Sequence, residues 1–366
     1  MKRLLAAVLS LVLATPMLAG CASNLPKGYS PFASAPPESA SSTAPEAVPE
    51  QRPETPPSGK GLATGLAILN SVAKSKDAGE EDGLAEADTN IVAVLVDAQG
   101  RIVDCKIDAV QAKIPFSKEG KLLADTAAMF RTKQELGGEY GMKKASGIGK
   151  EWYEQANALA AYVTGKTVEE IKGIALTETT APADAELAAT VTISIGDWIA
   201  SIEKAVANAK PLGAKAGDKL GMGTVTNMSK SKDAGAEDGL AQVDSIYAAA
   251  SFGTDGRVTS CILDGSQSSV RFDKTGKITT GLDIAPQTKN ELKEAYGMKQ
   301  ASGIGLEWYQ QAENYARYAL GKTADELSGI AVNDSGSPQD AELAASVTIS
   351  VGDFNLALGK AADSAR

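Results

Sequence analysis

The chain contains one internal repeat with a fixed offset of 156 positions, and this repeat limits the architectures open to it. Four short blocks recur at that offset without any insertion or deletion between them. They are 75–79 with 231–235, 140–143 with 296–299, 145–149 with 301–305, and 184–188 with 340–344. The offset is far longer than a solenoid repeat and has the length of a whole domain. We therefore expect two homologous domains, 61–208 and 219–364, joined by a linker at 209–218.

The first sixty residues have the composition of an export signal followed by an unstructured stalk. Lys2 and Arg3 precede an apolar stretch at 4–13, which is too short to span a bilayer. The sequence Leu-Ala-Gly-Cys that ends at Cys21 resembles a bacterial lipobox, which implies a signal peptide at 1–20 and lipidation of Cys21. Residues 21–60 are rich in Pro, Ser, Ala and Glu, and they lack the apolar side chains that would offset the entropy of ordering.

This pattern predicts a location outside the cytoplasm. Acyl chains on Cys21 would hold the protein on the outer face of the cell membrane, and the stalk would carry the two domains away from the lipid. Ordinary secretion with an unmodified cysteine is the alternative.

Charge and composition exclude several classes of function. The net charge is −10, which gives no electrostatic footprint for a nucleic-acid partner. The sequence contains no histidine, so imidazole general bases, Ser-His-Asp and Cys-His nucleophile systems and histidine-ligated zinc are absent. A hydrolase is therefore not favoured.

Each repeat begins with the pattern of a β-hairpin. Residues 90–96 are apolar and β-branched, Asp-Ala-Gln-Gly at 97–100 supplies a turn, and 101–107 returns as a second strand. In the second copy, Thr-Asp-Gly at 254–256 occupies the turn.

Helical periodicity follows the hairpin. Apolar side chains at helical spacing predict a helix over 150–163, which Gly165 ends. Thr167 and Glu170 have the spacing of a capping box that opens a further short helix, and the second copy repeats the device.

The end of each repeat predicts one more strand and a final helix. Over 187–195, apolar residues alternate with Ala, Thr and Ser, which predicts a strand with hydroxyls on one face. Asp197 is expected to cap the last helix. The predicted class is α+β: a tandem duplicated domain, each copy an antiparallel β-sheet packed by helices on one side.

Cys105 and Cys261 occupy equivalent positions, so neither domain can close an internal disulfide. Cys105 is expected to share a strand face with Val103 and Ile107, which favours a buried structural thiol. A redox role or a bridge between the domains is the alternative.

The acidic stretch from Asp77 to Asp88 suggests calcium binding at first sight. Its spacing does not follow an EF-hand loop, and Glu80 is replaced by Ala236 in the second copy. A solvated acidic loop and no metal site are therefore expected.

Two further segments carry chemistry. Lys-Lys-Ala-Ser-Gly-Ile-Gly at 143–149 precedes the long helix, where glycines allow close approach and free N–H groups could bind an anion. A plain turn that leads into a helix cap explains the same residues. Residues 184–192 open the hydroxyl-faced strand, and both copies place a hydroxyl, Thr190 or Ser346, at the same point.

The order of these features resembles the FMN-binding domain family, found in flavin-carrying subunits of Rnf-type and sodium-pumping redox complexes and in tandem-domain electron-transfer lipoproteins. The resemblance rests on the Asp-x-x-Gly-Arg hairpin, the Gly-Ile-Gly turn, the Gly-Lys-Thr connection and the segment from Asp184 to Thr192. The family motif Asp-x-x-Ser/Thr-Gly-Ala-Thr/Ser ends in a hydroxyl that forms a phosphoester with FMN. Leu187 and Ala188 depart from its Ser/Thr-Gly pair, as do their counterparts in the second copy, so covalent attachment stays open.

The resemblance implies FMN as the cofactor and a set of residues that would hold it. They are Asp184, Thr190, Thr192, Ser146, Gly147 and Gly149 in the first copy and Asp340, Ser346, Thr348, Ser302, Gly303 and Gly305 in the second. Trp152, Tyr153, Trp308 and Tyr309 are candidate neighbours of the flavin ring, although core packing explains the tryptophans equally well.

The implied function is an electron relay without a substrate of its own. Its partners would be a membrane dehydrogenase or quinol as donor and a flavin transferase for maturation. The alternative is a module of the same ancestry that has lost the cofactor and binds a ligand or a surface.

Overall fold

The structure is a computed structural model that describes residues 61–365. The expected signal peptide at 1–20, lipidation at Cys21 and stalk at 21–60 lie outside the described residues. Both repeats belong to one compact unit. Between residues 61 and 365, no helix is long and apolar enough to cross a membrane.

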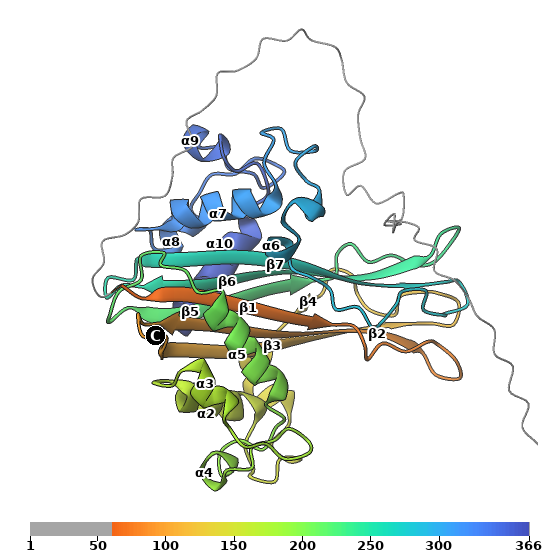
Figure 1. Cartoon of the computed structure of the whole chain (residues 1–366). Helices are drawn as coiled ribbons and strands as arrows, with labels where there is room; N and C mark the ends of the chain where they lie inside the picture. Colours follow the sequence, from red (N-terminus) through yellow and green to blue (C-terminus); the bar gives the residue numbers. More distant parts are fainter. Residues whose placement is uncertain (1–60, 366) are drawn as a thin grey trace, which may run out of the picture. The chain divides into compact units, whose positions relative to one another are not determined.

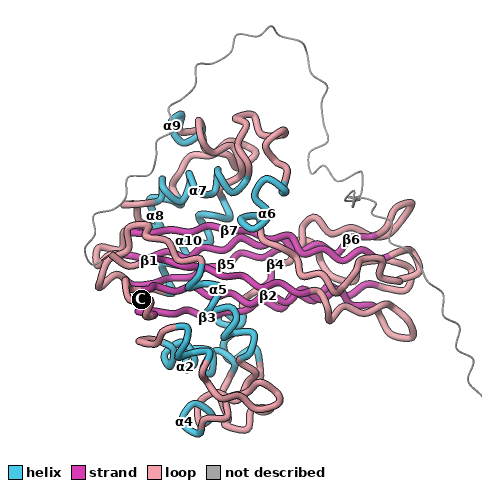
Figure 2. The backbone as a smooth tube through the Cα atoms, in the orientation of Figure 1, coloured by secondary structure: helices cyan, strands magenta, loops and turns pink. Residues whose placement is uncertain are grey.

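Each repeat builds a three-stranded antiparallel meander (Figures 1 and 2). In the first repeat the order is β1-β2-β3, and in the second it is β5-β6-β7, to which the short β4 of the first repeat adds at β5. The bounds are β1 Ala63–Ser71, β2 Gly83–Val96, β3 Ile102–Phe116, β4 Met129–Phe130, β5 Lys219–Asn227, β6 Gly239–Phe252 and β7 Val258–Phe272.

The predicted hairpin is confirmed in both copies, with longer strands than expected. Asp97 Oδ1 closes the first turn by accepting hydrogen bonds from the backbone N–H groups of Gln99 and Arg101, each at 2.9 Å. The first strand, β2, is apolar over 91–96 because both of its faces are buried.

A bulge overturns the expectation that Val103 shares a face with Cys105. Leu95 pairs with Asp104 but Val96 pairs with Ile102, so Val103 is the extra residue. Val103 is 41 % exposed, whereas Cys105 and Ile107 are buried against the helices.

Helices cover the outer face of each sheet. The first repeat contains α1 Lys133–Leu136, the 3₁₀ helix η1 Gly137–Tyr140, α2 Trp152–Val163, α3 Val168–Lys172, α4 Ala185–Ala188 and α5 Gly196–Ala207. The second contains α6 Lys289–Leu292, η2 Lys293–Tyr296, α7 Trp308–Ala319, α8 Ala324–Ser328, α9 Ala341–Ala344 and α10 Gly352–Ser364. The helix expected over 150–163 is α2, and Thr167 and Glu170 do form the capping box of α3.

The predicted strand at 187–195 is wrong. Asp184 accepts hydrogen bonds from Glu186 N and Leu187 N and so begins the short helix α4. The segment that follows is an irregular loop that starts with a turn; Val191 and Ile195 are buried, but no neighbouring strand pairs with it. Alternating burial without a pairing partner produced the strand-like pattern.

Asp197 does not cap the last helix of the first repeat. Helix α5 begins at Gly196 with Ile195 at the cap position, and Asp197 lies in its first turn. A carboxylate there still interacts favourably with the helix dipole, so the signal marked the helix start correctly to within two residues.

The two sheets face each other and share one core, which supports the α+β class (Figure 1). Inner faces of both repeats contribute to it, and helices lie on the outer faces, α2 and α5 on one side and α7 and α10 on the other. Where β3 and β7 end, the rings of Phe116 and Phe272 stack with centroids 4.2 Å apart. These residues are equivalent in the two repeats, so the arrangement is pseudo-symmetric.

The repeated block at 75–79 locks the repeats together. Asp77 Oδ1 accepts a hydrogen bond from Ile278 N (2.7 Å), and Ala78 N donates to Gly276 O (2.8 Å). In reciprocal fashion, Asp233 Oδ1 accepts from Leu122 N (2.8 Å). The acidic segment considered for calcium thus contains one half of an inter-repeat contact.

The sheet edges meet at two seams, where β1 runs beside β7 and β3 beside β5. Helix α5 lies so close to β1 that a Cβ on Gly65 would stand 2.0 Å from Ala205 O. Lys204 donates to Ile68 O (2.8 Å) and pairs with Glu291 of the other repeat (2.5 Å). Lys204 thereby covers the Ile68 carbonyl at the edge of β1, which prevents this edge from pairing with another strand.

A buried carboxylate anchors the chain next to each seam. Asp108 Oδ1 accepts from Ala109 N (2.7 Å) and Gln134 N (3.1 Å), and Asp264 does the same in the second repeat. Burial raises the pKa of Asp108 to about 7 and that of Asp264 likewise to about 7, although the hydrogen bonds act in the opposite direction.

We predict that folding stability falls as pH rises from about 4 to about 7. The folded protein holds protons on Asp108 and Asp264 in this range and the unfolded chain does not, so each carboxyl contributes on the order of 3 kcal/mol across the window. Urea unfolding at a series of pH values measures this slope. It should shrink in Asp108→Asn, nearly vanish in the double variant with Asp264→Asn, and persist in the exposed control Asp82→Asn.

Candidate functional site

The glycine-rich block at 143–149 forms two consecutive tight turns before α2. Ser146 N donates to Met142 O (3.0 Å), and Gly149 N donates to Ser146 O (3.0 Å). Gly149 has φ of +63°, which favours glycine. Gly147 is exposed, and a Cβ placed on it would meet no atom within 4 Å, so the turn faces open space.

The start of α2 is acidic, which disfavours a free anion at its N–H groups. Glu151 and Glu154 form a capping box, in which Glu154 Oε2 accepts from Glu151 N at 2.8 Å. Glu151 Oε2 also accepts from Met142 N (2.8 Å). An added anion would meet two carboxylates here, so the structure favours the interpretation of this segment as a turn that leads into a helix cap.

The second predicted segment, 184–192, covers α4 and the first residues of the loop that follows it. Asp184 is exposed and serves as the helix cap. Thr190 is half-buried, and its hydroxyl donates to Leu187 O (3.2 Å). Ser346 has the same position and donates to Leu343 O (3.3 Å).

A buried glutamine that the sequence did not single out brings the two segments together. Gln155 on α2 is fully buried, and its Nε2 donates to Ser146 Oγ (3.1 Å). Its Oε1 accepts from Thr192 N (2.8 Å), from the Thr192 hydroxyl (3.3 Å) and from Ile193 N (3.2 Å). We call this group of contacts the glutamine junction.

The junction is repeated in the second copy with nearly the same distances. Gln311 Nε2 donates to Ser302 Oγ (3.1 Å), and its Oε1 accepts from Thr348 N (2.8 Å) and Ile349 N (3.2 Å). One glutamine side chain thus bridges Ser146 to Thr192 in the first copy, and another bridges Ser302 to Thr348 in the second. Asp184 and Asp340 remain apart from the junction as helix caps.

The residues fit a phosphate ester better than a bound free anion. Thr190 and Ser346 present half-exposed hydroxyls that make one local hydrogen bond each within residues 61–365. Gly147, and Gly303 in the second copy, leave the adjacent turn open. The glycine of the family motif is replaced by Ala188 at the end of α4, so the approach to the hydroxyl differs from the family pattern.

The aromatic and sulfur candidates belong to the core. Trp152 is 4 % exposed and packs against Trp198 at 5.7 Å between ring centroids, and Trp308 is equally enclosed. Tyr153 and Tyr309 are half-buried. Cys105 and Cys261 are buried free thiols, and burial raises the pKa of Cys261 to about 12. A thiol with this pKa is not a nucleophile at neutral pH, which agrees with a structural role.

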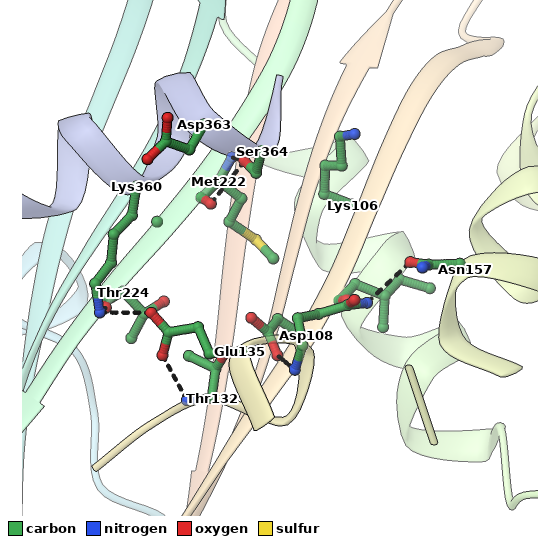
Figure 3. A pocket seen from close by; sticks show the side chains of 13 residues that line it. Lys106, Asp108, Thr132, Glu135, Asn157, Met222, Thr224, Lys360, Asp363 and Ser364 are labelled. Atoms are coloured by element: carbon green, nitrogen blue, oxygen red, sulfur yellow. Dashed lines mark hydrogen bonds and ion pairs between the residues drawn. The ribbon is translucent and has the colours of Figure 1, made fainter. Parts of the chain in front are cut away.

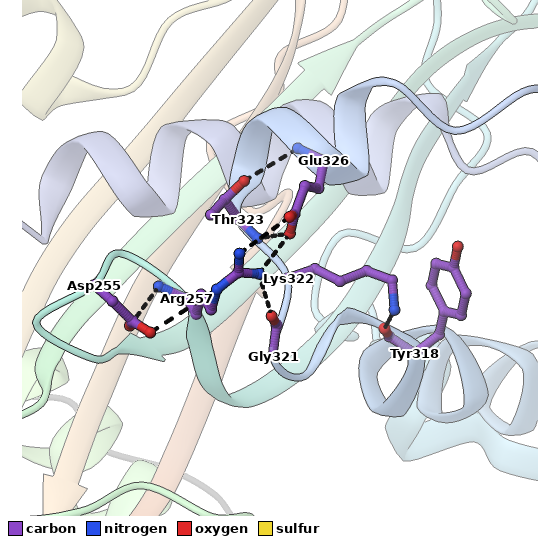
Figure 4. A network of polar contacts seen from close by, with 7 residues as sticks. All are labelled: Asp255, Arg257, Tyr318, Gly321, Lys322, Thr323 and Glu326. Atoms are coloured by element: carbon purple, nitrogen blue, oxygen red, sulfur yellow. Dashed lines mark hydrogen bonds and ion pairs between the residues drawn. The ribbon is translucent and has the colours of Figure 1, made fainter.

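Two other blocks of the resemblance form a structural network (Figure 4). The arginine that follows the hairpin turn, Arg257, donates to Gly321 O (2.6 Å) and pairs with Glu326 (2.8 Å). Thr323 and Glu326 form the capping box of α8, and Arg101 makes the equivalent contacts in the first repeat. The hairpin and the Gly-Lys-Thr connection are therefore held to each other by these contacts.

A cavity lies at each seam between the repeats, and sequence analysis did not anticipate either. The β3/β5 seam encloses about 480 Å³ beside Asp108, and Figure 3 shows Lys360 reaching Thr224 and Glu135 at its edge. The β7/β1 seam encloses about 790 Å³ beside Asp264. Both depend on residues 100 or more positions apart, so no local pattern signals them.

Comparisons with known proteins leave the family open. No family model matches the chain, and no solved structure matches it. One similar protein is a chlorophenol reductase of Desulfitobacterium hafniense, 36% identical over 92 residues. The match covers 22% of this chain and 28% of that protein.

We predict that Gln155→Leu loosens both segments of the first junction. The change leaves several backbone and hydroxyl donors without an acceptor, which should lower the free energy of unfolding by roughly 2–4 kcal/mol. Amide hydrogen exchange should accelerate at 142–150 and 189–195 but not in the second repeat. The exposed Gln99→Leu is the matched control, and unchanged exchange in both segments would contradict the role assigned to Gln155.

Proposed function

We propose that the chain is a lipid-anchored extracytoplasmic flavin carrier, with one FMN on each repeat, that relays electrons from a membrane dehydrogenase or quinol. The observation that carries this proposal is the glutamine junction. It places the glycine-rich turn next to the Thr190 segment in the first copy and next to the Ser346 segment in the second. These are the two segments that the family resemblance implies for FMN.

The chain's own residues would attach and orient the cofactor. FMN supplies the electron-carrying chemistry when bound, and no protein acid or base is needed for it. Thr190 and Ser346 would carry the phosphate, after action by a flavin transferase. Gln155 and Gln311 would fix the backbone next to those hydroxyls, and the open turns at Gly147 and Gly303 leave room beside them.

The two copies differ in the charge offered to a phosphate. The turn of the first copy has lysines at 143, 144 and 150, where the second copy has Lys299, Gln300 and Leu306. Opposite charge favours binding of a phosphorylated ligand, so the first repeat should hold FMN more tightly than the second. A partial relative named as a reductase is compatible with redox chemistry but, at 28% of its length, adds little weight.

A cofactor-free binding module is the second candidate, and specific observations favour it. Glu151 and Glu154 place negative charge at the start of α2. Leu187 is buried in α4, where the family motif has a small hydroxyl residue. Both features would hinder a phosphate.

We predict that the full chain co-expressed with a flavin transferase gains two FMN mass increments and a visible flavin spectrum. Thr190→Ala and Ser346→Ala should each remove one increment, because each removes one ester oxygen. Intact-mass spectrometry makes the measurement. Ser194→Ala and Ser350→Ala are matched hydroxyl deletions four residues downstream and should keep both increments.

A colourless product that also takes up no free FMN would overturn the carrier proposal and favour the binding module. If flavin is retained non-covalently and both hydroxyl variants are still yellow, the phosphoester is excluded and the electron-relay proposal stands.

A further inference from the structure

The two seam cavities are equivalent by pseudo-symmetry, but they have diverged. Three side chains that are polar or charged at the β3/β5 seam are apolar at the β7/β1 seam: Lys106 corresponds to Ile262, Thr224 to Ile68, and Asp363 to Ala207. The β7/β1 cavity is also larger, about 790 Å³ against about 480 Å³. This volume is in the range of small-molecule sites.

The linker between the repeats contributes to this difference. Pro211 and Leu212 line the β7/β1 cavity, and Lys210 is hydrogen-bonded through its backbone to Thr64. The linker thereby adds an apolar wall on one side of a pocket whose floor is already apolar. The β3/β5 cavity has no such wall among its lining residues.

The rim of the β7/β1 cavity has gained positive charge. Lys293 stands where the first repeat has Gly137, and Arg317 stands where it has Ala161. Glu313 replaces Asn157 and pairs with Arg317, so Lys293 is the added cation without an acidic partner among the ion pairs of residues 61–365. Glycine suits the backbone there, since Gly137 has φ of +52°. Lys293 keeps φ of +47°, a strained conformation for a residue with a side chain. A conformation of this kind costs on the order of 1–3 kcal/mol, so replacing this lysine with glycine should stabilise the fold.

The acidic groups of this cavity already have partners. Asp264 accepts backbone hydrogen bonds from Gly265 and Asn290, and Glu291 pairs with Lys204 at 2.5 Å. Glu313 pairs with Arg317 at 3.2 Å. The lysine at 293 therefore adds a cation to a rim whose carboxylates are engaged.

We propose that the β7/β1 seam cavity binds an amphipathic organic anion, with an apolar body against Ile262, Ile68 and Leu212 and an anionic head at Lys293. This site is separate from the glutamine junctions and does not depend on flavin. Its ligand class follows from the apolar residues at 68, 212 and 262 and from the lysine at 293, none of which has an equivalent of the same kind in the β3/β5 cavity.

The test uses 8-anilinonaphthalene-1-sulfonate and its uncharged counterpart N-phenyl-1-naphthylamine, titrated by fluorescence into the full chain. The sulfonate should bind with one site per chain and at least tenfold more tightly than the neutral probe. Lys293→Gly should weaken sulfonate binding about fivefold or more while raising the melting temperature, since it restores the residue that the backbone favours. Arg317→Ala releases the Glu313 carboxylate at the rim and should also weaken sulfonate binding, and Ile262→Lys should weaken binding of the neutral probe.

Lys106→Ala removes a lysine from the equivalent smaller cavity and should leave the affinity unchanged. If Lys293→Gly weakens binding but stabilises the fold, the loss of affinity comes from the missing lysine and not from a loosened structure. Equal binding of both probes, or sulfonate binding that survives Lys293→Gly and Arg317→Ala together, would overturn the proposal. Because neither Thr190 nor Ser346 lines this cavity, the test is independent of whether FMN is attached.

Discussion

The structure depends on one constraint: each three-stranded sheet has two apolar faces, and its own helices cover only one of them. Leu95 and Ile91 point toward the inner core while Val92 and Val94 meet the helices, so the inner face needs a partner of equal size. The second repeat supplies it, and the Phe116–Phe272 stack joins the two halves where β3 and β7 end. Duplication therefore creates the core itself, and the seams and their cavities follow from the way two identical surfaces meet.

Local signals predicted the parts of each repeat that are held by local contacts. The hairpin turn at Asp97, the helix that begins at Trp152 and the capping box at Thr167 all involve partners within a few residues. The loop after α4, which local signals predicted to be part of a strand, shows where these signals fail. Its alternation between buried and exposed residues is real, but a strand also requires a neighbour, and none lies beside it. Strand β1 was missed because Gly65 weakens its pattern, and that glycine is needed for the close approach of α5.

The candidate sites show the same difference between local contacts, which the sequence reveals, and long-range contacts, which it does not. Both halves of the glutamine junction were found by their sequence blocks, whereas Gln155 looked like an ordinary polar position on a helix until its burial was seen. In place of the strand expected around Thr190, Asp184 caps the short helix α4. In place of a free helix start, Glu151 forms a capping box at α2. In both cases a carboxylate accepts hydrogen bonds from nearby backbone N–H groups. The seam cavities join residues from both repeats, and no pattern within one repeat contains that information.

Reciprocal contacts between covalently joined halves also bear on how such a protein can evolve. In a dimer of identical chains, one mutation alters both seams at once, so a change that benefits one seam must be tolerated by the other. Fusion into one gene removes this coupling. A lysine in place of glycine after α6, with glycine retained after α1, illustrates a substitution that symmetry would have forced on both positions.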